Sequence, residues 1–596
     1  MIEYDKITGL NKASHTADLC VVGGGIAGML AAISAARHGI SVILMHDRPV
    51  LGGNASSEIR MWIRGADGDN MRETGILEQL ALENIYRNPT LNYSIWDSVL
   101  YEAVRFQDGL DIILNCACTD AKMKDGKITS ISGYQSTTQT WHTVSATLFA
   151  DCSGDSILAP LTGAKWRIGR ESQAEFGESI APKESDNSVM GMSCLFQARP
   201  ADKPVKFIPP KWAYKYDKDS FPFRMHLKTP DDWLKDNYWW IEIGGMGDSI
   251  ADTEANRDRL LKIVFGVWDF IKNGGYCNAD NWELDWVGFL PGKRESRRYI
   301  GDYVLKQQDV EKGVMFEDTI AYGGWTLDDH NSLGFDTKQK PNNIQPSSSP
   351  YCIPYRCIYS QNIPNLFFAG RNISVSHTAF SSTRVMATCG LIGQAVGTAA
   401  AIAIKSGLTP RQVGKQKIKE LQNDLMVDDC YLPGFARPMP KVMENAKVTA
   451  NGYNAALLTN GIDRPVGYTG NCWRAVAGDE IMISFIQKTN INQVRIVFDS
   501  ELNRESWTDV FSKHKRFPQR CHVRKDSNDV YVPKTLVKEY ILEGYNGDKW
   551  ETIYTENNNY QRLNIINING SFDKIRLIAK STWGADCFGI YAFYAL

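Results

Sequence analysis

The glycines near the start of the chain have the types and the spacing that bind a dinucleotide. Residues 23–28 read Gly-Gly-Gly-Ile-Ala-Gly, so Gly23, Gly25 and Gly28 form a G-x-G-x-x-G fingerprint around Ile26 and Ala27. We expect Gly23 to permit a tight turn, Gly25 to let the backbone approach a pyrophosphate, and Gly28 to let a helix pack closely on a strand. The pattern predicts a dinucleotide site, and a purely structural turn is the other interpretation.

An acidic residue about 20 positions after the fingerprint usually holds the ribose hydroxyls of the nucleotide. The sequence has His46 at the expected place and Asp47 one residue later. We therefore predict that Asp47 is the ribose ligand, and that His46 and Arg48 lie beside it in the cofactor site.

Three further segments resemble elements of glutathione-reductase-type flavoproteins, and they favour FAD over NAD. Residues 51–56 resemble the second glycine turn, which lies along the pyrophosphate and flavin in those proteins. Residues 151–155 (Asp-Cys-Ser-Gly-Asp) resemble a conserved strand end, and residues 365–372 resemble the late strand whose glycine and following polar residue hold the ribityl chain. The resemblance implies non-covalent FAD. The residues that it adds to the FAD site are Gly52, Gly53, Asn54, Ala55, Ser56, Cys118, Ser153, Gly154, Asp155, Gly370, Arg371, Ser382, Arg384 and Val385.

Over residues 15–430 the chain is similar to the bacterial FAD-dependent oxidoreductase family called FAD_oxidored, part of which carries a xanthan-lyase-like description. The fingerprint and residues 47–54, 292–298 and 370–377 carry this resemblance. It implies a fold and a cofactor more than a substrate. His46 departs from the glutamate that is usual in flavoproteins.

Flavin oxidation of an alcohol needs a base for the hydroxyl proton, and histidine has a suitable pKa. His377 stands between the Gly370 element and a long uncharged segment, and we predict it as the base, with a structural hydrogen bond as the other interpretation. His330, in an aromatic and glycine-rich stretch, is the second candidate. His38 and His514 are more typical of solvated residues.

A basic cluster at residues 293–298 follows an apolar run that ends in a glycine turn. Arg294 and Arg297 in this cluster could bind an anionic substrate or hold the flavin through bidentate contacts. A solvated charged face is the other interpretation. Arg60 and Arg64, which follow the second glycine turn, are weaker candidates of the same kind.

Residues 385–404 form a run without charge, as long as a membrane span. Its glycines and its Ala-rich composition favour a buried helix instead. We expect this helix to begin near residues 381–384, to direct its N-terminus at the flavin pyrimidine edge, and to pack on the cofactor and the first strand.

The pattern of strands and helices predicts an α/β doubly wound, Rossmann-like FAD-binding domain of the glutathione-reductase type. We expect a helix at 29–38 and strands at the short apolar runs 18–22, 41–45, 110–118, 128–134, 147–151 and 365–369. We assign it to 1–168 and 345–430, around an inserted α+β substrate domain at 169–344. A linker at 431–440 precedes a C-terminal antiparallel β-sandwich at 441–596, where period-2 alternation begins. This last segment resembles a discoidin-like or galactose-binding-like domain. The residues that carry the resemblance are Asn460-Gly461, Trp473, Trp550 and Trp583-Gly584.

Composition excludes several classes of protein. With 66 Lys+Arg against 68 Asp+Glu, the chain lacks the electrostatic footprint of a nucleic-acid binder. Thirteen cysteines without a C-x-x-C pair match neither a disulfide framework nor a zinc site, so we expect no metal and a cytoplasmic setting. Residues 1–20 lack the apolar core of a signal peptide, and a periplasmic location would need a leader that has been removed.

These observations predict a soluble FAD-dependent oxidoreductase that transfers hydride from a hydroxyl-bearing small molecule (a sugar, a glycoside or a sugar acid) to flavin N5. Two hypotheses stay open. One is flavin-dependent reduction of an activated C=C bond, with an arginine as proton donor, as a resemblance to the fumarate-reductase-like superfamily would allow. The other is a carbohydrate-binding protein with structural FAD. The identity of the electron acceptor stays open, and so does the formation of a homo-oligomer.

Overall fold

The computed structural model describes residues 2–4, 9–220, 238, 241–504, 506–508, 513–517 and 531–596. The chain forms two compact units, which we describe separately. Unit 1 comprises residues 1–65, 90–418 and 516–528, and unit 2 comprises residues 66–89, 419–515 and 529–596.

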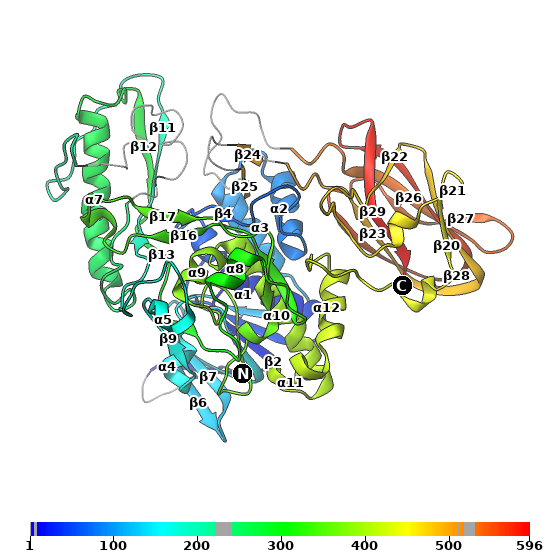
Figure 1. Cartoon of the computed structure of the whole chain (residues 1–596), viewed down its shortest axis with the longest axis horizontal. Coiled ribbons are helices and arrows are strands. Elements are labelled where there is room, and N and C mark those ends of the chain that lie inside the picture. The colour runs from blue at the N-terminus through cyan, green and yellow to red at the C-terminus, as the bar shows by residue number, and fades with distance from the viewer. Residues whose placement is uncertain are drawn as a thin grey trace. The chain divides into compact units, whose positions relative to one another are not determined.

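A parallel sheet is the centre of unit 1 (Figure 1). β3 (Val42–Met45), β2 (Asn11–Val22) and β8 (Thr140–Asp151) are neighbours, with β5 (Leu110–Ile113) beyond β3 and β19 (Leu366–Phe368) beside β8. The central strands are buried on both faces, which explains their continuous apolar runs. The sheet confirms the predicted Rossmann-like architecture.

One predicted strand is wrong. The segment 110–118 is two strands, β5 and β6 (Cys116–Lys124), because Asn115 between them adopts a left-handed backbone with φ of 55°. β6 then pairs antiparallel with β7 (Lys127–Gln135) across a turn at Asp125 and Gly126, and β7 pairs antiparallel with the first half of β8. The parallel sheet therefore continues into an antiparallel meander.

The uncharged segment forms one helix, as predicted, but the predicted start near residues 381–384 falls at the end of a separate short helix that precedes it. α9 (His377–Thr383) ends at Arg384, and Val385 takes an extended backbone that N-caps α10 (Met386–Ser406). α10 packs on α1 (Ile26–Arg37) and not chiefly on the first strand. A Cβ on Gly393 would lie 2.1 Å from the Ala27 carbonyl oxygen, and one on Gly397 would lie 2.2 Å from that of Ala31. These two glycines therefore let the helix backbones touch.

Among the described residues, α10 is the helix that is long and apolar enough to cross a membrane, and 94% of its apolar window is buried inside the protein. Within the same ranges, His, Cys, Asp and Glu side chains form no group of three or more that could hold a metal ion.

The middle of the chain adds short antiparallel strand pairs and one long helix to unit 1. α7 (Thr253–Asn273) packs its apolar face on the antiparallel pair of β11 (Phe196–Pro200) and β12 (Trp282–Val287), around the buried ring of Trp268. The other elements of unit 1 are β1 (Ile2–Tyr4), β4 (Ile63–Arg64), α3 (Tyr93–Arg105), α4 (Leu158–Thr162), β9 (Trp166–Arg167), α5 (Gln173–Phe176), β10 (Met192–Ser193), β13 (Gly292–Lys293), β14 (Arg298–Tyr299), α8 (Gln307–Lys312), β15 (Thr319–Gly323), β16 (Leu327–His330), β17 (Asn342–Gln345), β18 (Tyr351–Pro354) and α11 (Pro410–Gln416).

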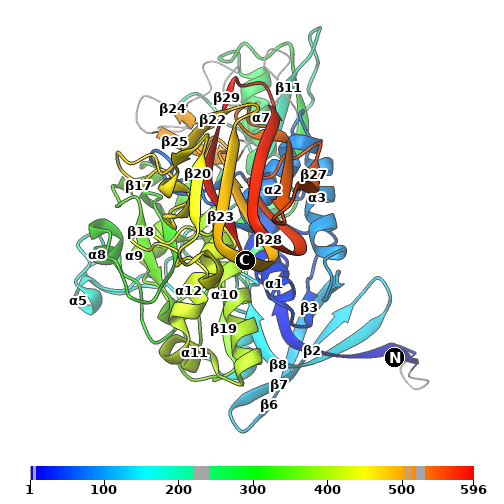
Figure 2. The same cartoon turned by 90° about the vertical axis from the view of Figure 1, so that its right-hand side faces the viewer.

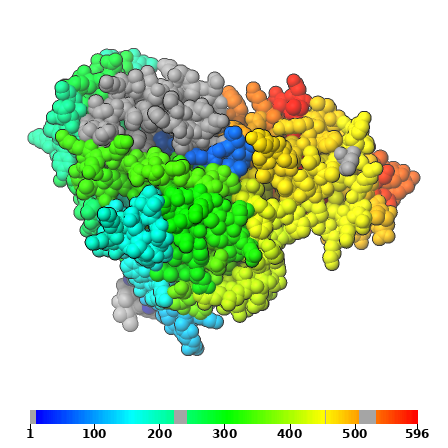
Figure 3. Space-filling model, viewed as in Figure 1, coloured from blue at the N-terminus to red at the C-terminus, as the bar shows by residue number. Residues whose placement is uncertain are grey.

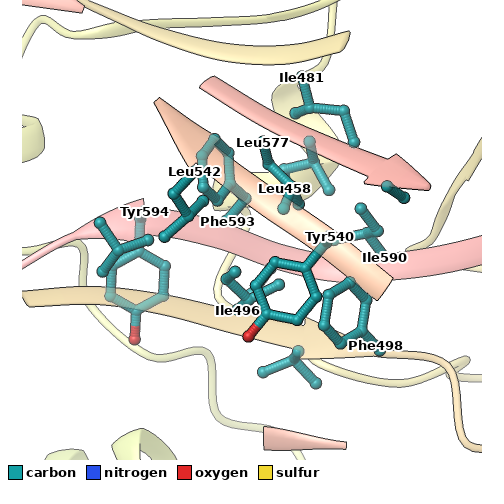
Figure 4. Close-up of a cluster of buried hydrophobic side chains, with 14 of the residues drawn as sticks. Leu458, Ile481, Ile496, Phe498, Tyr540, Leu542, Leu577, Ile590, Phe593 and Tyr594 are labelled. Atoms are coloured by element: carbon teal, nitrogen blue, oxygen red, sulfur yellow. The ribbon is translucent and has the colours of Figure 1, made fainter. Parts of the chain in front are cut away.

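Unit 2 is built on an antiparallel sheet, as predicted for the C-terminal region. Figure 2 shows β23 (Glu480–Phe498), β28 (Leu563–Thr582) and β29 (Cys587–Ala595) side by side. Alternate side chains such as Ile481, Leu577 and Phe593 gather in one apolar core (Figure 4). The remaining helices and strands of unit 2 are α2 (Ile76–Arg87), α12 (Ile418–Val427), β20 (Lys447–Ala450), β21 (Tyr453–Asn454), β22 (Trp473–Val476), β24 (Ser506–Thr508), β26 (Val537–Tyr545) and β27 (Trp550–Glu556), and β25 (Lys513–Phe517) runs from unit 2 into unit 1.

Candidate active site

The three fingerprint glycines differ in what surrounds them. A Cβ on Gly23 would lie 2.5 Å from the Cys152 carbonyl oxygen, and one on Gly28 would lie 1.8 Å from the Gly23 carbonyl oxygen. Both positions are therefore closed by the protein's own backbone. A Cβ on Gly25 would have only the Gly53 Cα near it, at 3.9 Å. Packing accordingly explains Gly23 and Gly28, whereas Gly25 borders open space at the N-terminus of α1, where a Cβ would fill the cradle expected for a pyrophosphate.

The second glycine turn lies against the first. Gly52 donates its N–H to the Gly24 carbonyl oxygen at 2.8 Å, and a Cβ on Gly53 would lie 3.1 Å from the Gly25 Cα. Both Gly52 and Gly53 have positive φ, which their lack of a Cβ allows. Asn54, Ala55 and Ser56 continue the turn: Ser56 Oγ bonds the Gly53 carbonyl oxygen, and Asn54 Nδ2 bonds that of Lys293.

His46 holds these two turns together. It is buried, its Nδ1 accepts the Gly24 N–H at 3.0 Å, and its Nε2 lies 3.1 Å from the Val50 carbonyl oxygen. The ring therefore faces the protein backbone. The side chain of Asp47 is 63% exposed, and Arg48 lies within 3.4 Å of Glu58. The ribose role of Asp47 stays a prediction.

Arg371 and Gly154, two of the other predicted FAD residues, meet at Asp155. Its carboxylate accepts from Arg371 Nη2 at 2.8 Å and pairs with Lys293, and the Arg371 guanidinium lies over Gly154. Burial raises the pKa of Asp155, but Arg371 and Lys293 outweigh this effect and lower it. Ser153 bonds Asp151 at the end of β8. Gly370 lies near Ala27 of α1, while Cys118 is half-buried on β6.

Five buried polar atoms near the α9–α10 junction and the Gly370 turn have no hydrogen-bond partner among the described residues. They are Arg371 Nε, Asn372 Oδ1, Thr383 Oγ1, Arg384 Nε and Thr388 Oγ1. Such atoms are costly unless something bonds them. Together with the Gly25 cradle, they fit a cofactor that offers donors and acceptors, as the flavin and ribityl groups of FAD do. The Ser382 hydroxyl already has a partner within the protein, since its Oγ lies 2.7 Å from Tyr351 Oη.

His377 lies between two carboxylates. Its Nδ1 is 3.0 Å from the Glu295 carboxylate, and its Nε2 is 3.1 Å from Oδ1 of Asp329. Burial alone would lower the pKa of His377, but Glu295 and Asp329 outweigh it and raise the pKa to about 10. Both ring nitrogens then carry protons, and an imidazolium cannot accept another. The predicted role of His377 as the base does not fit this geometry.

The carboxylate of Glu295 belongs to a chain of alternating charges. Arg298 pairs with Glu295 and, through Nη2, with Glu171 Oε1 at 2.8 Å. Glu171 in turn accepts the backbone N–H of His377 at 2.7 Å, which fixes the first residue of α9. Burial raises the pKa of Glu171, but Arg298 and the His377 N–H lower it to about 2. In Figure 3, cyan and green segments of unit 1 meet on the face in view, and Gln308 of α8 bonds the Gly177 carbonyl oxygen at the end of α5.

His330 lies in a second charged cluster. Its Nδ1 is 2.7 Å from Glu242 Oε2, and its Nε2 is 3.2 Å from Asp328 Oδ2. Arg294 lies 3.5 Å from Glu242, and Arg384 lies 3.2 Å from Asp328. Burial lowers the pKa of His330, but Glu242 and Asp328 raise it overall. We call these five residues, Arg294, Glu242, His330, Asp328 and Arg384, the Arg384 cluster.

Sequence reasoning chose the basic members of these networks and missed the acidic ones. Glu295 stands within the motif that was selected for Arg294 and Arg297, and Asp329 precedes His330. Alternation on β16 is a usable signal, because Asp329 contacts α9 while its two neighbours face the Arg384 cluster. Arg297 does not join Arg294: it lies 3.4 Å from the Asp155 carbonyl oxygen and 5.3 Å from the centre of the Trp166 ring.

Comparison with known proteins identifies the N-terminal two thirds of the chain. A sequence model of the family described as FAD dependent oxidoreductase matches residues 18–425. A search of curated proteins finds no match.

Solved structures also resemble parts of the chain. A geranylgeranyl bacteriochlorophyll reductase-like protein from Thermoplasma acidophilum is 13% identical over 70% of this chain and 86% of its own, with a TM-score of 0.34. A p-nitrophenol 4-monooxygenase from Pseudomonas putida is 11% identical over 69% and 86%, with a TM-score of 0.31. A family 32 carbohydrate-binding module from Streptococcus pneumoniae is 12% identical over 26% and 97%, with a TM-score of 0.19.

Proposed function

Because the chain belongs to the FAD-dependent oxidoreductase family, we propose that it binds FAD non-covalently and oxidises a hydroxyl group of a sugar, a glycoside or a sugar acid. Bound FAD supplies the hydride acceptor for such a reaction. The chain must then supply a group that takes up the hydroxyl proton.

The carboxylate of Asp329 is the observation that carries this proposal. Its Oδ1 is bonded to His377, and its Oδ2 has no hydrogen-bond partner in the described part of the chain. The Asp329 side chain is 27% exposed, whereas Glu295 on the other side of the imidazole is fully buried. Asp329 is therefore the member of this triad that a substrate can reach.

Four residues, the triad and Glu171, divide the work of a general base. Asp329 Oδ2 takes up the proton as the substrate hydroxyl becomes a carbonyl group. The His377 imidazolium donates to Oδ1, which orients the carboxylate and compensates its charge. Glu295 holds the far side of the ring, and Glu171 holds the His377 backbone. A positioned base of this kind contributes about 10² to 10⁴ in rate.

An anaerobic spectroscopic screen tests the proposal. Flavin-loaded protein is mixed with sugars, glycosides, sugar acids and enoates, and the flavin absorbance is followed. We expect a hydroxyl compound to bleach the oxidised flavin. If no hydroxyl compound does so, while an enoate reoxidises flavin that has been reduced chemically, the direction of the reaction is reversed.

Arg294 favours that reverse reaction as the second candidate function. It is buried, its Nη1 bonds Ser193 Oγ at 2.9 Å, and burial lowers the pKa of its guanidinium despite Glu242. A buried arginine with a lowered pKa is a better proton donor to a carbanion than a solvated one. The enoate arm of the screen decides between the two directions.

The finer assignments of the chain are part of the proposal. We propose the glutathione-reductase subtype for the FAD domain, with the boundaries 1–168 and 345–430 around the insert at 169–344. For 441–596 we propose a discoidin-like sandwich after a linker at 431–440, supported by the alternating strands of unit 2. A cytoplasmic location is proposed as well. A crystal structure of the FAD complex, with a glycan-binding assay, tests the two structural assignments.

A further inference from the structure

Three arginines are buried together in unit 2. Arg437, Arg495 and Arg562 are each at most 3% exposed. Asp463 pairs with Arg437 and Arg495, and a second carboxylate, that of Asp429, pairs with Arg562. We call these five residues the Arg437 cluster. Because an arginine in a protein keeps its charge, the three guanidinium groups exceed the two carboxylates even when both carboxylates are ionised.

The three arginines differ in how well their charge is compensated. Arg495 also donates to two carbonyl oxygens at the C-terminus of α12, and Arg562 also donates to two backbone carbonyl oxygens. The Nη1 of Arg437 donates to Asp463 Oδ2 at 2.6 Å, and Arg495 uses the same oxygen. The Nε and Nη2 of Arg437 are buried donors without a hydrogen-bond partner among the described residues. Beyond this shared oxygen, Arg437 has the ring of Tyr594 at 4.7 Å from its Cζ, a weaker cation–π contact.

A cavity of about 20 Å³ adjoins Arg437. Asp463 and Arg464 lie on its wall as well, and Arg464 is held by the Asn70 carbonyl oxygen and the Thr74 hydroxyl. A space of this volume admits one particle of the size of a water molecule. It is therefore too small for a sulfate, a phosphate or a carboxylic acid.

From the net charge, the two unpartnered N–H groups and the size of the cavity, we propose that unit 2 binds a chloride ion at Arg437. Nε and Nη2 form one edge of the planar guanidinium, so a single spherical anion accepts hydrogen bonds from both. The ion compensates a buried positive charge, which is costly when it is left alone. This site lies in unit 2 and goes beyond the hydroxyl oxidation proposed for unit 1.

A water molecule is the other occupant that the cavity admits. Asp463 Oδ1 is a buried acceptor without a partner in the described part of the chain, and water can donate a hydrogen bond to it. The two occupants differ in charge. Only the chloride ion makes the stability of the protein depend on the anion of the buffer, because a ligand of the folded state stabilises it in proportion to the logarithm of its concentration.

Thermal unfolding of the full, FAD-loaded chain tests for the ion. The melting temperature is measured in sodium chloride, sodium bromide and sodium methanesulfonate at one ionic strength, where methanesulfonate is the anion that exceeds the cavity. We expect chloride and bromide to raise the melting temperature by about 2 to 8 °C, with saturation. Equal melting temperatures in the three salts would overturn the proposal.

Arg437→Met tests the residue. Methionine keeps most of the length of the side chain and removes the donors, while Asp463 stays paired with Arg495. The variant should melt at the same temperature in all three salts. Arg474→Met removes an arginine of unit 2 that is 57% exposed, and this matched control should keep the chloride effect. A chloride effect that persists in Arg437→Met rejects the site.

Bromide locates the ion without any variant, so the result stands even if Arg437→Met does not fold. A crystal of the wild-type chain grown in sodium bromide should give an anomalous bromine peak within hydrogen-bond distance of Arg437 Nε and Nη2. A water molecule in the cavity, or no peak, rejects the proposal. A peak without any chloride effect on melting means binding at crystal concentration only and also rejects it. None of these outcomes bears on hydroxyl oxidation, which the flavin screen tests separately.

Discussion

The imidazole Nε2 of His377, in helix α9, lies 3.1 Å from the carboxylate of Asp329, in strand β16. This contact joins two residues that are 48 positions apart in the sequence. In the proposed mechanism, the contact makes His377 a cation that positions Asp329 as the base. Several consequences can be measured.

Gly25 and Gly28 should respond differently to valine. Gly25→Val adds a side chain where the protein leaves space, so the variant should fold with a nearly unchanged melting temperature and lose FAD. Gly28→Val places a Cβ on the Gly23 carbonyl oxygen and should destabilise unit 1 itself. Flavin content and thermal melting of both purified variants check this. A Gly25→Val protein that keeps full FAD contradicts the assigned cradle.

His377→Asn should lower the free energy of unfolding by about 3–5 kcal/mol, because Glu295 and Asp329 lose the cation between them. Denaturant unfolding at neutral pH measures this difference. Ser381→Ala, also in α9 and buried, is a control that leaves both carboxylates paired. A loss below about 1 kcal/mol would show that the two carboxylates do not depend on the imidazolium.

The stability that His377 contributes should depend on pH. Its pKa is about 10 in the folded protein, above the ordinary value of 6.5. A raised pKa stabilises the fold fully below pH 6.5, and this contribution is lost as pH rises toward 10. The difference in unfolding free energy between wild type and His377→Asn should therefore shrink between these limits. A constant difference over the range would contradict the double ion pair.

Gly393→Val should separate α1 from α10. The new Cβ would meet the Ala27 carbonyl oxygen at 2.1 Å, and backbone atoms cannot move aside cheaply. We expect a loss of about 1–3 kcal/mol or more, with weaker FAD binding because Ala27 adjoins the cradle. Gly407→Ala at the C-cap of α10 has a φ of 64° but no atom within 4 Å of its Cβ, so it should lose only the roughly 1 kcal/mol of left-handed backbone strain and keep FAD binding. Unchanged melting of Gly393→Val would contradict the close helix packing.

Nicotinamide cofactors should not reduce this flavin rapidly. The sequence contains one G-x-G-x-x-G fingerprint, and the proposal gives it to FAD. Anaerobic mixing with NADH or NADPH should leave the flavin oxidised on the time scale of turnover. Fast bleaching by either one would require a second dinucleotide site.

The elements of this protein that could be predicted are those that a local sequence pattern specifies. Glycine spacing and continuous apolar runs specify the β2–α1–β3 unit, and alternation specifies the sheet of unit 2. The contacts that decide the chemistry are not local. Residues 66–89 belong to unit 2, where Glu78 pairs with Arg504, although only residues 57–65 separate them from the second glycine turn in the sequence. No periodicity in the sequence predicts a pairing between residues so far apart.

The same reason explains why the sequence does not predict the protonation of His377. The types of His377 and His330 indicate acid–base chemistry, but their protonation depends on Glu295, Asp329, Glu242 and Asp328, which other segments supply. His46 shows the effect beside the glycine turns. Its position after β3 predicts a nucleotide contact, which stays a prediction, and no local pattern indicates that its ring bonds Gly24 and Val50.

The rate of flavin reduction in Asp329→Asn tests the central claim most directly. FAD-loaded wild type and variant are mixed anaerobically with the hydroxyl compound that the screen identifies, and the loss of oxidised flavin absorbance is timed. Asparagine keeps the shape of the side chain and can still bond His377, so FAD content and substrate binding should persist. The account predicts a reduction rate about 10² to 10⁴ lower in the variant. An unchanged rate in Asp329→Asn, or a wild type that no hydroxyl compound reduces, would contradict it.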